Sequence, residues 1–150
     1  MIDSRWLILL AEDNEADVFL VRTALEENVR DFRLQVFEDG ERVLEHLERI
    51  DEDLAPCPDV VLLDLNMPKV GGEEVLQRLR NSIPCGSTPV IVMTSSSQAM
   101  DKERAKALGI TYFFQKPDDY DAFLRVGKVV STVLETGTTT IVGSLDPTSA

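Results

Sequence analysis

The chain has 150 residues, of which 43% are apolar, so we expect one globular domain with a packed core. The net charge of −12, from 27 acidic against 15 basic residues, repels phosphate backbones and argues against direct nucleic-acid binding. The apolar runs are strand-sized, far below the roughly 20 residues of a membrane span, so we expect no contact with a membrane.

Short apolar runs alternate along the chain with segments of helical periodicity. The runs that predict strands are, in chain order, 6–11, 33–37, 60–64, 90–93 and 112–115. The segments that predict helices are 15–27, one that opens at Gly40, one that opens at Gly72, 99–108 and 120–134. Gly109 follows the fourth helix, as expected of a helix C-cap. Strand and helix therefore alternate five times, which predicts an α/β fold with a doubly wound, five-stranded parallel sheet.

Two long loops, 51–59 and 81–89, are rich in proline, and each contains one cysteine. A zinc site is not expected, because Cys57 and Cys85 form no CxxC pair and the chain has a single histidine. We expect both thiols to be reduced, as in cytosolic proteins; a disulfide between them is the alternative that the sequence leaves open.

The composition changes after Leu134, which divides the chain into a domain of residues 1–135 and a polar tail of residues 136–150. The tail is rich in threonine, glycine and serine, and we expect it to be flexible. The strand propensity of residues 138–142 leaves docking on a sheet edge or on a partner open.

Polar side chains stand where four of the predicted strands end. Glu12 and Asp13 follow the first strand, Asp64 closes the third, Thr94 follows the fourth, and Lys116 follows the fifth. In a parallel sheet these ends meet at one edge, so three carboxylates, a hydroxyl and an ammonium gather in one crevice. The carboxylates repel one another at neutral pH, so they need a compensating cation, or one of them takes up a proton. Mg²⁺ suits this group because it prefers oxygen ligands.

These spaced elements, with the phrases LAEDNEADV and LDLNMPK, resemble the receiver domain of two-component response regulators over about residues 6–134. The phrases are most similar to the small stand-alone receivers that serve bacterial and cyanobacterial phytochromes. The resemblance implies a flavodoxin-like (βα)5 fold and a phosphorelay in which a sensor histidine kinase, with a phytochrome as the candidate, donates the phosphoryl group. Receivers usually carry Asp-Gly after Met-Pro, whereas Gly71 and Gly72 stand here, which leaves the conformation of this loop open.

The resemblance implies that Asp64 is the phosphoacceptor. It further implies that Asp13, Asp64 and the backbone carbonyl of Asn66 bind Mg²⁺ directly, while Glu12 acts through water. The side chain of Asn66 either tunes hydrolysis of the phosphoryl group or serves only the turn.

Thr94 and Lys116 are implied to contact the phosphoryl oxygens. Thr94 also serves as the switch hydroxyl, and Phe113, three residues before Lys116, falls at the position of the switch aromatic. An aromatic residue in a strand is equally compatible with a plain core role.

Three functions compete for this pattern. A receiver is not an enzyme, apart from intrinsic phosphotransfer and autodephosphorylation, and it signals through protein–protein contacts in the cytoplasm. A Mg²⁺-dependent phosphatase with an aspartyl-phosphate intermediate needs a second acid two residues after the nucleophile, where Asn66 stands. A flavin-binding module needs a phosphate loop after the first strand, where Glu12 and Asp13 would repel phosphate.

The last predicted helix is apolar on more than one side. Leu124 and Val129 are left on the surface when the sheet-facing residues are Phe123, Val126, Val130 and Val133. An apolar surface often marks an interface, so we expect a homodimer through the last strand and the last helix.

Overall fold

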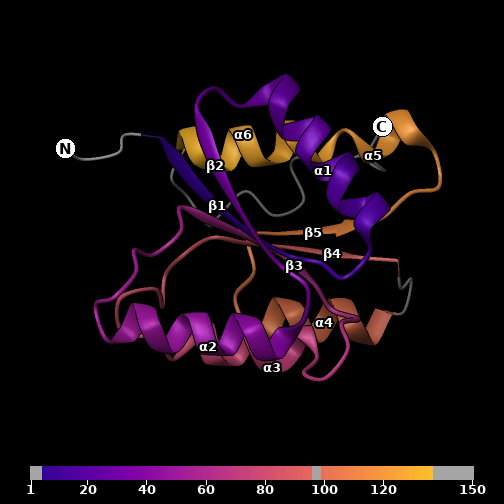
Figure 1. Cartoon of the computed structure of the whole chain (residues 1–150). Coiled ribbons are helices and arrows are strands. Elements are labelled where there is room, and N and C mark those ends of the chain that lie inside the picture. Colours follow the sequence, from indigo (N-terminus) through magenta and orange to yellow (C-terminus); the bar gives the residue numbers. More distant parts are fainter. Residues whose placement is uncertain (1–4, 96–98, 137–150) are drawn as a thin grey trace.

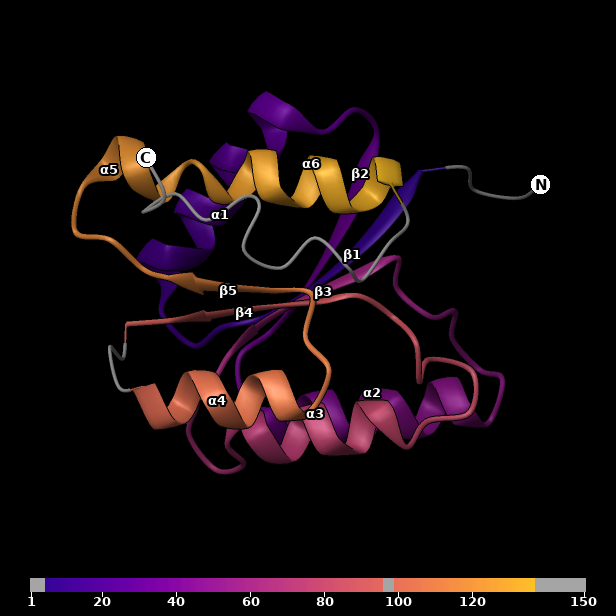
Figure 2. The ribbon, with the colours of Figure 1, turned by 180° about the vertical axis from the view of Figure 1, so that it is seen from behind.

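The computed structural model describes residues 5–95 and 99–136, which form one five-stranded parallel sheet between two layers of helices (Figures 1 and 2). The strands are β1 (Trp6–Ala11), β2 (Phe32–Phe37), β3 (Val60–Asp64), β4 (Val90–Thr94) and β5 (Tyr112–Gln115). The helices are α1 (Glu15–Asn28), α2 (Gly40–Asp51), α3 (Gly72–Arg80), α4 (Ala99–Ala107), α5 (Tyr120–Phe123) and α6 (Val126–Thr136). This confirms the predicted doubly wound α/β fold.

The sheet has the strand order β2-β1-β3-β4-β5, and all four pairings are parallel. From β1 the chain passes to β2 on one side of β1, and it then crosses to β3 on the other side of β1. Between β1 and β3 the strand order therefore reverses, and a crevice opens at the carboxyl ends of these strands. A flavodoxin-like sheet binds its ligands at this position.

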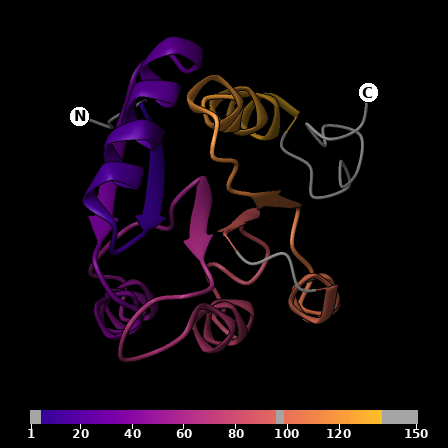
Figure 3. The same ribbon diagram turned by 90° about the vertical axis from the view of Figure 1, so that its right-hand side faces the viewer.

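Alternate residues of each strand face opposite layers of the molecule. Ile8 and Leu10 pack against α1 and α6, whereas Leu9 and Ala11 face the layer of α2, α3 and α4. The end view in Figure 3 shows these two helix layers on either side of the sheet. Every residue of β3 and β4 is buried, which explains why these strands appear in the sequence as continuous apolar runs.

Most predicted boundaries hold to within one or two residues. Asn14, Asp39 and Asp119 cap α1, α2 and α5 by accepting a hydrogen bond from a backbone N–H of the first turn. Gly109 has a φ of 76°, which confirms it as the left-handed residue after α4. The helix α6 ends at Thr136, and the rest of the predicted tail, residues 137–150, lies outside the described residues.

None of the helices within residues 5–95 and 99–136 has both the length and the apolar character needed to cross a bilayer.

The predicted last helix is wrong in one respect, because the structure divides it into α5 and α6. Short turns separate the two helices: the N–H of Arg125 donates to the Ala122 carbonyl, and the N–H of Gly127 donates to the Leu124 carbonyl. The apolar stripe of α6 is also wider than expected. Val129 is only 4% exposed, and Leu124 is half-buried against the core. The predicted surface patch is therefore absent from this described region, and the homodimer loses the observation that motivated it.

The expectation of two reduced cysteines is also wrong, because Cys57 and Cys85 form a disulfide. The two long loops lie side by side and are joined a second time where Ser82 donates a hydrogen bond of 2.6 Å to Asp51. Arg78 forms an ion pair with the same carboxylate. The two loops are far apart in the sequence, so only the folded sheet reveals this pairing.

The Gly71–Gly72 pair lies in the loop that carries the chain from β3 into α3. Gly71 is the N-cap of α3 and offers no side chain to its first turn. Gly72 packs directly on the strand end, since a Cβ there would lie 2.5 Å from the carbonyl oxygen of Asp64. A Cβ on Gly71 would meet only the Leu65 carbonyl, at 3.9 Å. The second glycine alone is required by close packing.

We therefore expect Gly72→Ala to lower the free energy of unfolding by about 1–3 kcal/mol, because the β3 backbone must move to admit a methyl group. The matched control Gly71→Ser should change it by less than about 0.5 kcal/mol, because serine is also a favoured N-cap residue and its Cβ would meet only an ordinary contact. Urea unfolding of the two variants and the parent measures the difference. Equal losses in both variants would contradict the packing argument.

Candidate phosphoacceptor site

The acidic pair follows β1 at the crevice. Glu12 is 1% exposed, and its backbone N–H donates to the Phe37 carbonyl at the end of β2. Its side-chain Oε1 accepts a bond of 3.1 Å from the backbone N–H of Asn14, which turns the chain into α1. Asp13, in contrast, is exposed at the mouth of the crevice. The two neighbouring carboxylates therefore differ in burial, although they are adjacent in sequence.

Asp64 closes β3 and is 5% exposed. Its Oδ1 accepts a bond of 3.0 Å from the backbone N–H of Asn66, which fixes the orientation of the carboxylate. A single carboxylate oxygen from each of Glu12, Asp13 and Asp64 lies within 4.8 Å of the other two. The structure thus brings together the three acids that the sequence predicted to converge.

Thr94 and Lys116 reach the same edge from β4 and β5. The backbone N–H of Lys116 donates to the carbonyl of Thr94 at 2.7 Å, which ties the two strand ends together. The hydroxyl of Thr94 is fully buried and accepts a bond of 2.9 Å from the side-chain amide of Asn66. Asn66 therefore links the end of β3 to β4, which is more than a plain turn residue would do.

The ammonium of Lys116 is the cation at the centre of this acidic group. Its Nζ lies 2.7 Å from Glu12, 2.9 Å from Asp17 and 3.4 Å from Asp64. Asp17 comes from the first turn of α1, and the sequence reading missed it. The only available signal was an acidic residue one helical turn after the acidic pair, a spacing that also suits an ordinary helix N-terminus.

Burial raises the pKa of Glu12 to about 7, and the charge of Asp64 adds to this effect, while the hydrogen bond from Lys116 opposes it. Burial alone would lower the pKa of Lys116. The hydrogen bonds to Glu12 and Asp17 and the charge of Asp64 outweigh it, so the pKa of Lys116 is raised. The lysine stays charged, and Glu12 is the acid that burial favours in its protonated form.

The residues present fit a divalent cation. Carboxylate oxygens are the ligands that hard divalent cations prefer, and Glu12, Asp13 and Asp64 offer three of them around one point. The exposed Asp13 leaves that point open to solvent, which suits an ion that retains some of its water ligands.

Phe113 lies on β5, the strand next to β4 and Thr94. It is half-buried against the layer of α2, α3 and α4, and the Nζ of Lys102 lies 5.9 Å from the centre of its ring. Phe113 is thus partly in the core and partly accessible, as either of its predicted roles would allow.

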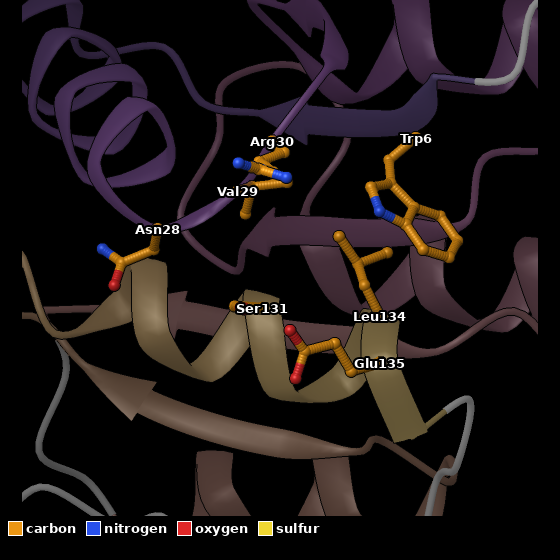
Figure 4. A pocket seen from close by; sticks show the side chains of 7 residues that line it. All are labelled: Trp6, Asn28, Val29, Arg30, Ser131, Leu134 and Glu135. Atoms are coloured by element: carbon orange, nitrogen blue, oxygen red, sulfur yellow. The ribbon is translucent and has the colours of Figure 1, made fainter.

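A hollow of about 340 Å³ lies at the opposite end of the sheet, where β1 begins (Figure 4). Trp6, Ser131, Leu134 and Glu135 line it together with residues 28–30, where α1 ends. The predicted site residues other than Phe113 lie at the other edge, where the strands end. A smaller hollow of about 230 Å³ lies at that edge and is lined by Glu12 and Asp13 among others.

Residues 8–126 match the family model for the response regulator receiver domain. The chain belongs to the response regulator receiver family. Such receivers are generally phosphoacceptors of two-component signalling rather than enzymes. Response regulator Rcp1 of Synechocystis sp. (strain ATCC 27184 / PCC 6803 / Kazusa) is 34% identical over 134 residues, which cover 88% of this chain and 91% of Rcp1.

Two solved structures share the fold and resemble the chain in sequence. The Mn²⁺-bound form of Rcp1 is 32% identical, with a TM-score of 0.80, over 89% of this chain and 97% of that one. The phosphorylated cyanobacterial phytochrome response regulator RcpA is 26% identical, with a TM-score of 0.81, over 90% and 97%. The chain therefore resembles phytochrome-associated receivers, as predicted.

The pKa of Glu12 generates a pH prediction for the protein without metal. The folded state holds the Glu12 proton more tightly than the unfolded chain, whose pKa is the ordinary 4.5. The resulting stabilisation is complete below about pH 4.5 and is lost as the pH rises through about 7, by up to about 3 kcal/mol. A glutamine at this position has no titrating proton, so Glu12→Gln should not show this loss of stability with rising pH.

Urea unfolding of the parent and of Glu12→Gln in EDTA at pH 5 and pH 8 measures the effect. The parent should lose more stability than the variant between the two pH values, because only the parent has the Glu12 carboxyl group. Equal pH dependence would show that Glu12 does not hold a proton in the folded protein.

Proposed function

We propose that this protein accepts a phosphoryl group on Asp64 from a phosphohistidine of a sensor kinase. One observation carries the proposal: Asp64, buried at the end of β3, lies within reach of two further carboxylates and of the ammonium of Lys116. A buried carboxylate beside a retained positive charge is a suitable nucleophile for phosphorus. The likeness to phytochrome response regulators supports a phytochrome as the kinase.

In the proposed reaction, one Oδ of ionised Asp64 attacks phosphorus in line with the bond to the histidine nitrogen. The new O–P bond forms as the N–P bond breaks. The electron pair of the N–P bond stays on the imidazole of the kinase. The ammonium of Lys116 donates to an oxygen of the transferred group. No general base is required, because the attacking carboxylate carries no proton.

Mg²⁺ is the proposed cation, held by Asp13, Asp64 and the Asn66 carbonyl, with Glu12 acting through water. When bound, it supplies positive charge that offsets the negative charge of the phosphoryl oxygens. The Mn²⁺-bound form of Rcp1, together with the carboxylate group in this chain, supports a divalent ion here.

Thr94 and Phe113 form the proposed switch. A hydroxyl can accept one hydrogen bond and donate another, so accepting from Asn66 is compatible with donating to a phosphoryl oxygen. A shift of Thr94 toward Asp64 would change the packing next to Phe113, which borders the layer of α2, α3 and α4. Partner proteins would bind to the altered surface, so the output is protein–protein contact.

The phosphatase alternative lacks its second acid. The side chain two residues after Asp64 is Asn66, which donates a hydrogen bond to Thr94. An amide is not acidic enough to protonate a leaving group.

The cytoplasmic location, the absence of nucleic-acid binding and the homodimer stay predictions. Sedimentation at several protein concentrations tests the dimer.

We expect Asp64→Asn to abolish phosphorylation, because an amide is not a nucleophile for phosphorus. Incubation with phosphoramidate and Mg²⁺, followed by intact mass, should give one adduct on the parent and none on the variant. Asp121→Asn, an exposed carboxylate of α5, is the matched control and should match the parent.

An adduct on Asp64→Asn in the same yield would refute the assignment. Continuous release of phosphate with no accumulated adduct on the parent would instead favour the phosphatase. Phosphotransfer profiling against the kinases of the source organism identifies the donor.

A further inference from the structure

The ammonium of Lys116 has three N–H donors, and three carboxylates surround it. The contacts to Glu12 and Asp17, at 2.7 and 2.9 Å, are short charge-assisted hydrogen bonds. The contact to Asp64, at 3.4 Å, is the longest of the three. Two donors are therefore held firmly, and the third points at the proposed phosphoacceptor.

Asp17 is the third residue of α1, where an acidic side chain usually has another task. In a capping box, this side chain accepts from the backbone N–H of the N-cap residue. Here the N-cap residue is Asn14, and its N–H donates to Glu12 instead. The carboxylate of Asp17 is thus directed to Lys116, and its side chain is only 22% exposed.

Asp17 also differs from the acids that can hold a cation. The group of carboxylates that converge within 4.8 Å contains Glu12, Asp13 and Asp64, and among the described residues it does not include Asp17. The contact that links Asp17 to the site is therefore its ion pair with Lys116.

We propose that Asp17 is a positioning residue for phosphoryl transfer: with Glu12, it holds two N–H groups of Lys116 so that the third is aimed at Asp64. This inference rests on the proposed function. As the phosphoryl group arrives, the weakest bond, to Asp64, is exchanged for a bond to a phosphoryl oxygen, while the other two stay in place. No covalent bond to Asp17 forms or breaks.

Without Asp17, one side of this support is missing. The ammonium would turn toward Glu12 and toward solvent, and it would have to be oriented during the reaction. We expect Asp17→Ala to slow phosphorylation by phosphoramidate about tenfold at saturating Mg²⁺, which corresponds to the loss of one charge-assisted hydrogen bond. Asp17→Asn should fall between, because its amide oxygen still accepts but carries no charge.

The matched control is Glu15→Ala, which removes the same charge from an exposed position in the same turn of α1. It should change the rate by less than about twofold, since a surface charge acts only through a screened field. The test that a merely structural role would not satisfy is a double-mutant cycle. In a Lys116→Met background, Asp17→Ala should cause no further loss, because the residue through which it acts is gone.

A second measurement does not depend on phosphorylation. Lysine ammonium groups held by several carboxylates exchange their protons slowly, so Lys116 should give an ¹⁵Nζ signal in the unmodified protein, assigned by its loss in Lys116→Met. Asp17→Ala should lose or shift this signal, and Glu15→Ala should retain it. An unchanged signal in Asp17→Ala would overturn the inference.

The kinetic outcomes separate this inference from the proposed function. A parent that forms the adduct, with an unchanged rate in Asp17→Ala, overturns the positioning role alone. So does a loss that disappears at high Mg²⁺ or persists in the Lys116→Met background. A parent that forms no adduct overturns the proposed function, and with it any part for Asp17 in phosphoryl transfer.

Discussion

The site depends on one buried ammonium that neutralises a crowded group of carboxylates. Lys116 contacts Glu12, Asp17 and Asp64, and its side chain is only 10% exposed. Buried charges are costly unless they are paired, so neither the lysine nor Glu12 would be stable here alone. The same contacts keep the lysine charged, and in the proposed reaction they aim it at Asp64.

The rest of the fold supports this arrangement. The parallel sheet brings the ends of β1, β3, β4 and β5 to one edge, and the reversal between β1 and β3 opens the crevice there. Gly72 lets α3 begin directly against the carbonyl of Asp64. Asn66 joins β3 to Thr94, and the backbone of Lys116 joins Thr94 to β5. A phosphoryl group on Asp64 would therefore meet residues that are already mechanically linked.

Sequence patterns predicted the sheet, five strands and the convergence of Glu12, Asp13 and Asp64, because buried strands leave continuous apolar runs and their ends share an edge. Asp17 was missed, since its contact depends on the direction in which α1 leaves β1, and an acidic first turn has an ordinary capping role. The disulfide between Cys57 and Cys85 joins loops that only the folded sheet brings together. The division between α5 and α6 arises from local turns that apolar periodicity does not reveal.

The most direct test of the central claim is the stability of Lys116→Met with and without metal. Urea unfolding in EDTA at pH 8, above the pKa of Glu12, should show a loss of about 3 kcal/mol or more, because the variant leaves the buried, ionised Glu12 without its cation. Saturating Mg²⁺ should restore more stability to the variant than it adds to the parent, since the metal ion then supplies the missing charge. Equal stability of the two proteins in EDTA, with the same gain from Mg²⁺, would contradict the account.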